Sequence, residues 1–294
     1  MQLLDGKLVS QKTKDDLKKK TESLILEGKR PPHLAAVLVG NNGASETYVA
    51  NKVKSCKEVG FESTLIKLEE QTSEADLIAL VKQLNEDEKI DGILVQLPLP
   101  KQINEFNIIN TIKPEKDVDG FHPVNTGKML LADENAFLPA TPFGIMLLLE
   151  HYNITTRGKR VVVVGRSNIV GRPISILMSQ QREFGDATVT LCHSKTKNLQ
   201  EITSQADILI SAIGNPDMLG ADMVKEGAVV IDVGIVRVSD DTTKLGYKLK
   251  GDIKFDEVAF KSSYITPVPG GVGPMTIAAL LKNTMKSYNQ HITK

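Results

Sequence analysis

VVVVGRSNIVGRP, residues 161–173, is the most informative segment of this sequence. Four β-branched residues in succession predict a strand that is buried on both faces of a parallel sheet. Gly165 predicts a sharp turn at the end of that strand, and Gly171 and Pro173 predict the start of a helix. A strand, a glycine turn and a helix in this order direct backbone N–H groups toward one point, where a phosphate can bind.

The glycine pattern of this loop does not by itself choose between two interpretations. The usual dinucleotide fingerprint has three glycines, and Ser167 stands in the place of the middle one. The loop therefore fits an ordinary strand-to-helix turn as well as a cofactor loop. Three further strands, expected at 187–192, 206–212 and 228–235, each end in small or polar residues, which is the pattern expected where a cofactor crosses the strand ends.

The composition argues against several classes of protein. The 294 residues are 41% hydrophobic and 24% charged, and 36 Lys and Arg balance 36 Asp and Glu, so we expect no binding to nucleic acid or to a membrane surface. The amino terminus shows no signal peptide, and no apolar run is long enough to span a membrane. Cys56 and Cys192 predict buried reduced thiols rather than a disulfide or a metal site. We therefore expect a cytoplasmic protein without a bound metal.

The first half of the chain predicts alternating helices and strands. Helices are expected at 10–28, 45–59 and 73–85, the second of them capped by Ser45, and strands at 34–40, 61–68 and 91–100. Tyr48 and Lys52 share one face of the second helix, one turn apart, just beyond the end of a strand. They could stack a flat ring and move a proton, or they could be a surface lysine over a half-buried tyrosine.

Two polar residues in the first half stand out from their surroundings. Gln96 is an amide inside an apolar run, so it either satisfies backbone groups or faces a site. Asp119 precedes Gly120, which fits an ordinary turn, although a carboxylate there could also accept paired N–H donors from a heterocycle. His122, next to Pro123, is interpreted as a structural histidine.

The predicted architecture is α/β, with two domains around a cleft. Residues 139–144 mark the crossing between the domains, where Thr141 is expected to cap a helix over 143–152. The Gly- and Pro-rich segment 266–276 would let the backbone approach a ligand closely, and Thr276 is expected to begin a C-terminal helix. We expect a catalytic domain over 1–141, completed by 276–294, and a Rossmann-type dinucleotide-binding domain over 142–275.

The cofactor specificity depends on the residues just after the second strand of the dinucleotide-binding unit. An NAD-binding unit usually carries an acidic residue there to hold the ribose hydroxyls. The sequence instead reads HSKT over 193–196, and Arg166 comes directly after the first glycine of the phosphate loop. A missing carboxylate together with an Arg, a Ser and a Lys suits an extra phosphate, so we predict NADP rather than NAD.

Five segments, in order along nearly the whole chain, resemble one family. They are YVANK (48–52), VQLPLP (95–100), KDVDGF (116–121), the glycine loop (165–173) and PVPGGVGPMT (267–276). The family is that of the bifunctional methylenetetrahydrofolate dehydrogenase/methenyltetrahydrofolate cyclohydrolases. One departure is Ala140, where some relatives carry a cysteine, and it bears only on a thiol at that position.

The resemblance implies an NADP-dependent oxidation of 5,10-methylenetetrahydrofolate to the methenyl cation, followed by hydrolysis to 10-formyltetrahydrofolate. It also implies a homodimer that acts on tetrahydrofolate derivatives in one-carbon metabolism and purine biosynthesis. In the folate site, the resemblance implies that Lys52 is the catalytic group, that Gln96 hydrogen-bonds Lys52, and that Tyr48 stacks on the folate. It also implies that Asp119 binds the pterin edge and that Pro269 and Gly273 line the folate entrance. The implied cofactor contacts are Gly165, Arg166, Ser167, Ser194 and Ile235.

Three other functions compete with this interpretation. An NAD-linked methylenetetrahydrofolate dehydrogenase without hydrolase activity would not need Arg166, Ser194 and Lys52. A folate- or nucleotide-binding protein that has lost its chemistry would not need an intact set of Lys52, Gln96 and Asp119. A 2-hydroxy acid dehydrogenase would need a paired His and Arg, and the sequence shows no such arrangement.

Overall fold

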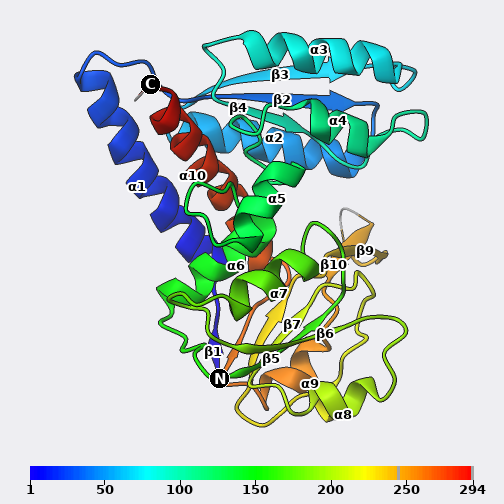
Figure 1. Cartoon of the computed structure of the whole chain (residues 1–294). Helices are drawn as coiled ribbons and strands as arrows, with labels where there is room; N and C mark the ends of the chain where they lie inside the picture. The colour runs from blue at the N-terminus through cyan, green and yellow to red at the C-terminus, as the bar shows by residue number, and fades with distance from the viewer. Residues whose placement is uncertain (244–245, 293–294) are drawn as a thin grey trace. The chain divides into compact units, whose positions relative to one another are not determined.

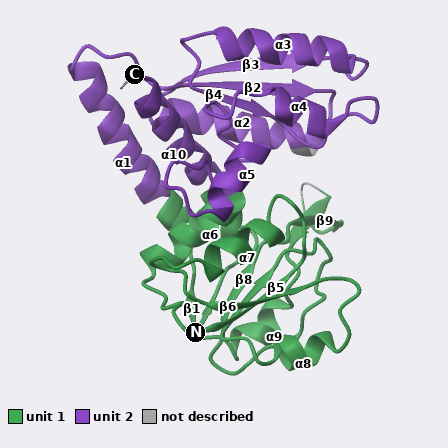
Figure 2. Cartoon of the chain, in the orientation of Figure 1, with its two compact units in different colours: residues 1–10, 141–276 green, residues 11–140, 277–294 purple. Residues whose placement is uncertain are grey.

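The computed structural model describes residues 1–243 and 246–292 and divides the chain into two compact units (Figure 2). Unit 1 contains residues 1–10 and 141–276, and unit 2 contains 11–140 and the described part of 277–294. Each unit is built on a parallel sheet that carries helices, so the predicted α/β fold class is confirmed. Within the described ranges, no helix combines the length and the apolar content that crossing a membrane requires.

Unit 2 is organised around a three-stranded parallel sheet with the order β3-β2-β4 (Figure 1). The middle strand is β2 (His33–Val39), and its flanking strands are β3 (Glu62–Leu68) and β4 (Gly92–Val95). Residues 34–39 are buried, which is why β2 reads as a continuous apolar run rather than as an alternating one. The helices that lie mostly or wholly in this unit are α1 (Gly6–Leu26), α2 (Gly43–Glu58), α3 (Glu74–Glu86), α4 (Glu105–Thr111), α5 (Pro123–Leu130) and α10 (Val272–Ile292).

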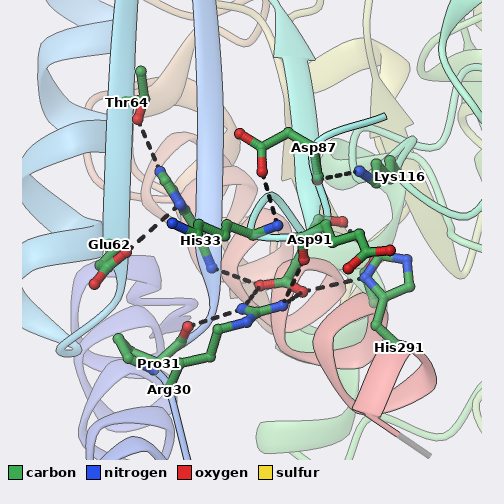
Figure 3. Close-up of polar contacts among 12 residues, drawn as sticks. Arg30, Pro31, His33, Glu62, Thr64, Asp87, Asp91, Lys116 and His291 are labelled. Carbon is green, nitrogen blue, oxygen red and sulfur yellow. Dashed lines mark hydrogen bonds and ion pairs between the residues drawn. The ribbon is translucent and has the colours of Figure 1, made fainter. Parts of the chain in front are cut away.

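A buried carboxylate ties the C-terminal helix to this sheet (Figure 3). Asp91, immediately before β4, is fully buried and binds both terminal nitrogens of Arg30 at 2.7 and 2.8 Å. It also accepts the backbone N–H of His33, and His291 of α10 places Nδ1 3.2 Å from its Oδ1. Ser287 of the same helix donates to the Asp91 carbonyl at 2.6 Å. Asp91 thereby joins the start of β2, the start of β4 and helix α10 within unit 2.

Unit 1 contains a six-stranded parallel sheet with the order β1-β11-β8-β7-β5-β6. The apolar run that predicted a buried strand forms β5 (Arg160–Val164), which lies between β6 (Thr188–Cys192) and β7 (Ile208–Ser211). The remaining strands of the sheet are β8 (Val229–Asp232), β11 (Tyr264–Ile265) and β1 (Gln2–Leu3), and β9 (Val236–Ser239) pairs with β10 (Tyr247–Lys250) in an antiparallel hairpin. The helices are α6 (Ala140–His151), α7 (Gly171–Ser179), α8 (Leu199–Thr203), α9 (Phe255–Ala259) and the 3₁₀ turn η1 (Ala221–Met223).

The first ten residues belong to unit 1, which differs from the expected division at 1–141. Gln2 and Leu3 pair with Tyr264 and Ile265 of β11, and the Leu4 N–H donates to the Ile265 carbonyl. They thereby add an edge strand to the six-stranded sheet. Two residues are too few to show the alternation from which a strand is predicted, so this pairing has no local signature in the sequence.

The starts of two helices also differ from the predictions. Asn42 rather than Ser45 caps α2, because its Oδ1 accepts the Ser45 N–H at 3.2 Å. Helix α6 begins at Ala140, so Thr141 does not cap it, and its hydroxyl lies 3.1 Å from that of Thr276.

Two further corrections concern proline-containing segments. Strand β4 ends at Val95 instead of continuing through residues 96–100. Helix α10 begins at Val272, before the predicted start at Thr276. Gly273 and Pro274 fit its first turn because the N–H groups there have no intrahelical acceptor, so a proline removes no hydrogen bond.

Candidate active site

One candidate site lies where α2 passes the carboxyl end of β4. The Lys52 ammonium, on α2, donates to Oε1 of Gln96 at 3.0 Å, and the lysine is only 7% exposed. Gln96 comes directly after β4, where its backbone N–H donates to the Val37 carbonyl and its Nε2 donates to the Leu97 carbonyl at 2.6 Å. Both the oxygen and the nitrogen of the amide are therefore hydrogen-bonded, and the oxygen is held toward the lysine. Tyr48 stands one helical turn before Lys52 and is 37% exposed.

The loop that carries Asp119 is fixed by a buried network. The Asp117 carboxylate accepts the backbone N–H groups of Phe121 and His122 at 3.2 and 2.8 Å and the Asn125 side-chain amide at 2.9 Å. Asn283, on α10, donates to the carbonyls of Val118 and Leu138 at 2.8 and 2.9 Å. These bonds on both sides of Asp119 hold its backbone in one place.

The side-chain carboxylate of Asp119 is available to a ligand. Within the described residues its carboxylate accepts no hydrogen bond, although burial raises its pKa to about 6. The positive charge of Lys52 lowers this pKa and the negative charge of Asp117 raises it. Asp119 is half-buried, and a carboxylate without a hydrogen-bond partner can accept N–H donors from a ligand.

The structure thus brings Lys52, Gln96 and Asp119 together in unit 2, with Tyr48 on the same helix as the lysine. Sequence reasoning missed Asp117 and Asn283, which hold the Asp119 loop. Asp117 had a signal, because it stands two residues before Asp119 in KDVDGF. Asn283 had no signal in the sequence, because it occupies a buried position in a long helix and contacts a loop that is remote in sequence.

A second candidate site is the loop after β5 in unit 1. Gly165 has φ +120°, and a Cβ there would overlap the carbonyl oxygen of Ala212. A Cβ on Gly171 would overlap the Gly165 carbonyl oxygen, so both glycines are required by close backbone approach. The Ser167 hydroxyl accepts the N–H groups of Val170 and Gly171 at 3.1 and 3.3 Å, which closes the turn where the usual fingerprint has its middle glycine.

Several backbone N–H groups of this loop are available to a ligand. The N–H groups of residues 166–169 find no acceptor in the described part of the chain. They precede the first turn of α7, where the helix dipole favours an anion. The loop therefore fits a pyrophosphate group, which is the part of a dinucleotide that such a turn holds.

Cationic and hydroxyl side chains stand just beyond the ends of β5 and β6. The two strands are paired up to Val164 and Cys192, and the Gly165 N–H donates to the Cys192 carbonyl at 2.9 Å. Arg166 and Ser194 come two residues after these paired ends and are exposed, as is Lys195. No acidic residue occurs over 193–196, so this edge suits a phosphorylated ribose.

The other predicted ligand contacts also lie in unit 1. Ile235 lies beyond the end of β8 and is 42% exposed. Pro269 lies between β11 and α10, and Gly273 lies in the first turn of α10. Pro269 and Gly273 are exposed, and they belong to a different compact unit from Lys52.

Two family models match the chain. Residues 4–119 match the tetrahydrofolate dehydrogenase/cyclohydrolase catalytic domain, and residues 139–292 match the NAD(P)-binding domain of the same family. The chain belongs to the tetrahydrofolate dehydrogenase/cyclohydrolase family. The resemblance inferred from the five sequence segments is thereby confirmed.

Individual members of the family are similar to this chain over its full length. The bifunctional protein FolD of Flavobacterium johnsoniae is 60% identical over 294 residues, which is 100% of this chain and 99% of that relative. The crystal structure of the bifunctional FolD of Campylobacter jejuni has a TM-score of 0.92 at 50% identity and covers 99% of both chains. The Trypanosoma brucei FolD structure, complexed with NADP and an inhibitor, has a TM-score of 0.94 at 37% identity and covers 99% of this chain and 98% of that one.

Proposed function

We propose that this chain oxidises 5,10-methylenetetrahydrofolate with NADP and hydrolyses the resulting 5,10-methenyltetrahydrofolate to 10-formyltetrahydrofolate. The observation that carries the proposal is the pairing of a buried Lys52 with Gln96 beside an Asp119 carboxylate that has no hydrogen-bond partner in the described residues. The same chain carries a glycine loop with unpaired backbone donors and no acidic residue at the ribose position. Family membership supports both activities.

The oxidation needs positioning more than acid or base chemistry. The hydride leaves a carbon between two nitrogens, whose lone pairs stabilise the cation that forms, and bound NADP supplies the acceptor. Asp119 would accept N–H groups at the pterin edge, and the Tyr48 ring would stack on the folate. In unit 1, the loop at 165–171 would hold the pyrophosphate, and Arg166 and Ser194 would hold the ribose phosphate, which favours NADP over an NAD-linked enzyme.

The hydrolysis needs a proton acceptor. Water adds to the methenyl carbon and loses a proton. The bond from that carbon to N5 then breaks as N5 takes up a proton, and the second proton of the water leaves as the formyl group forms on N10. The Lys52 amine, on α2, would accept the proton that the water gives up. Gln96 orients the amine through its Oε1 without adding charge. Pro269 and Gly273 would line the entrance for the folate.

The experiment that tests the proposal follows both steps in one assay. Purified protein is given 5,10-methylenetetrahydrofolate with NADP or with NAD, and the appearance and decay of the methenyl product are recorded by absorbance. We expect formation with NADP, a clearly higher Michaelis constant for NAD, and decay faster than in buffer. Methenyl formation without enzyme-dependent decay would instead support the monofunctional dehydrogenase, and no formation would support a binding protein.

We also propose that the protein acts as a homodimer in the cytoplasm and supplies 10-formyltetrahydrofolate for purine biosynthesis. Cys56 and Cys192 are both free and buried, and burial raises the pKa of the Cys56 thiol to about 12, which suits a reducing compartment. Light scattering after size exclusion should give about twice the chain mass of 32.1 kDa. A mass equal to one chain would contradict the dimer.

A further inference from the structure

Two buried aspartates stand at the carboxyl edge of the unit 1 sheet, apart from the residues assigned to the two candidate sites. Asp232 is the last residue of β8 and is 3% exposed, and Asp252 lies just after β10 and is fully buried. In the described part of the chain, neither carboxylate is paired with a lysine or an arginine. Their oxygens instead accept hydrogen bonds from donors in three separate segments of the chain.

Asp232 holds the segment that leads away from β8 and the segment that contains Asp252. Its Oδ1 accepts the backbone N–H groups of Gly234 at 2.9 Å and of Asp252 at 3.0 Å. Its Oδ2 accepts the Ile253 N–H at 2.9 Å. The turn that precedes Ile235 is therefore closed by Asp232.

Asp252 holds the loop after β7. Its Oδ2 accepts the Ser211 hydroxyl at 2.9 Å and the Ile213 N–H at 2.8 Å. Its Oδ1 accepts the Asn215 N–H at 2.9 Å. Through these three bonds one carboxylate fixes the chain on both sides of Ala212, whose carbonyl lies against Gly165 of the phosphate loop.

The two carboxylates also pack closely against glycines. A Cβ on Gly234 would overlap Oδ1 of Asp252, and a Cβ on Gly251 would overlap Oδ2 of Asp232. Each aspartate therefore packs against a glycine that lies next to the other aspartate or two residues after it, Gly251 beside Asp252 and Gly234 after Asp232. Burial raises the pKa of Asp232 to about 7, and the negative charge of Asp252 adds to this effect. Two carboxyl groups buried this close together without a cationic partner are costly to the fold, so stability alone does not explain the pair.

The strand order says which part of the cofactor these loops would meet. Strands β8 and β7 lie on one side of β5, and β6 lies on the other side. A dinucleotide crosses the carboxyl ends of such a sheet with its pyrophosphate at the central glycine turn. The phosphorylated ribose would lie toward β6, where Arg166 and Ser194 stand, so the nicotinamide half must extend over the loops after β7 and β8.

We propose that Asp232 and Asp252 are positioning residues for the dehydrogenase reaction, which jointly fix the loops 211–215 and 232–235 against the nicotinamide half of NADP. The inference rests on the proposed function, because it assumes that unit 1 binds NADP. The two aspartates themselves would not contact the reacting atoms. Their effect is transmitted through backbone groups, Ile235 among them.

The test compares two amide variants with a matched control in the same unit. In Asp232→Asn and Asp252→Asn one acceptor oxygen becomes an NH₂ group that faces another N–H donor. We expect the Michaelis constant for NADP to rise about tenfold, because a buried donor loses its acceptor. Hydrolysis of 5,10-methenyltetrahydrofolate, assayed without NADP, should stay within about twofold of wild type because Lys52 and Gln96 lie in unit 2 and neither aspartate contacts them.

The control is Asp207→Asn, which makes the same chemical change just before β7, at the opposite end of that strand. Asp207 binds Lys225 and accepts the Arg160 N–H, and it holds neither loop. Its Michaelis constant for NADP should stay at the wild-type value. An equal rise in this control would show that the aspartates act only through stability.

Each remaining outcome is decisive. A parallel loss of both activities in the Asn variants, or no change in either, would overturn the inference. If neither Asn variant folds, Ser211→Ala decides, because it removes only one donor to Asp252: a severalfold rise in the Michaelis constant for NADP supports the inference, and an unchanged value overturns it. If wild-type protein does not oxidise methylenetetrahydrofolate with NADP, the proposed function fails first, and the inference falls with it.

Discussion

The two units prepare their candidate sites by opposite means. In unit 2 the backbone around Asp119 is held by hydrogen bonds on both sides, and the group left available is a side chain, the Asp119 carboxylate. In unit 1 the side chain of Ser167 closes the turn, and the groups left available are backbone N–H donors over residues 166–169. The difference teaches that the folate side depends on which side chains are present, whereas the cofactor side depends on the shape of the backbone.

The strongest challenge to this comparison is Gly171→Ala. Because its Cβ would overlap the Gly165 carbonyl, the loop must change shape, and we expect a loss of about a hundredfold in kcat/KM for NADP. Hydrolysis of methenyltetrahydrofolate should persist. Gly127→Ala, in α5 with open space around the added carbon, is the control for a glycine-to-alanine change. A variant that keeps wild-type use of NADP would show that backbone shape does not decide cofactor binding.

The corresponding change in unit 2 removes a side chain and leaves the backbone intact. Asp119→Ala should raise the Michaelis constant for the folate about thirtyfold, since a charged acceptor of ligand N–H groups is lost. The constant for NADP should change little. Steady-state kinetics with each substrate varied in turn measures both constants. Equal increases in both would indicate that Asp119 is only a turn residue.

A smaller effect is expected at the ribose end of the cofactor site. Arg166→Ala should raise the Michaelis constant for NADP about tenfold, because a charge-assisted bond to the extra phosphate is lost. NAD lacks that phosphate, so its constant should not change. Arg157→Ala, which lies before the start of β5 and pairs with Asp186, serves as the control. A rise for both cofactors would argue against a contact with the phosphate.

The smallest effect concerns pH. Because the pKa of Asp119 is raised to about 6, its carboxylate is ionised above that pH and takes up a proton below it. The protonated form is the poorer acceptor, so the Michaelis constant for the folate should rise as the pH falls through about 6. The same profile should be flat in Asp119→Asn, which does not titrate. A wild-type profile that matches the Asn variant would remove the carboxylate from folate binding.

How much the sequence could predict depends on whether the signal was local. The apolar run before Gly165 correctly predicted a buried strand of a parallel sheet, and YVANK correctly placed Tyr48 and Lys52 one turn apart on a helix. The contact of Lys52 with Gln96 joins residues that are 44 positions apart, and it was expected from family resemblance rather than from spacing.

Features that depend on distant contacts were not predicted. Asp91 binds Arg30, His33 and a helix near the end of the chain, and nothing local distinguishes it from an aspartate in a turn. Asp252 stands among alternating apolar and charged residues, and its role becomes visible only when the loops after β7 and β8 fold against it. Buried polar groups of this kind are satisfied by tertiary structure, which propensity and periodicity do not report.

The most direct test of the account is to give 5,10-methenyltetrahydrofolate to Lys52→Met and record its decay. Loss of the proton acceptor should reduce the enzyme-dependent rate at least about a hundredfold, while the melting temperature and the affinity for NADP stay at wild-type values. Lys54→Met, on the same helix with its amine exposed, should hydrolyse at the wild-type rate. Decay at the wild-type rate in Lys52→Met would contradict the role given to Lys52 and with it the mechanism proposed for unit 2.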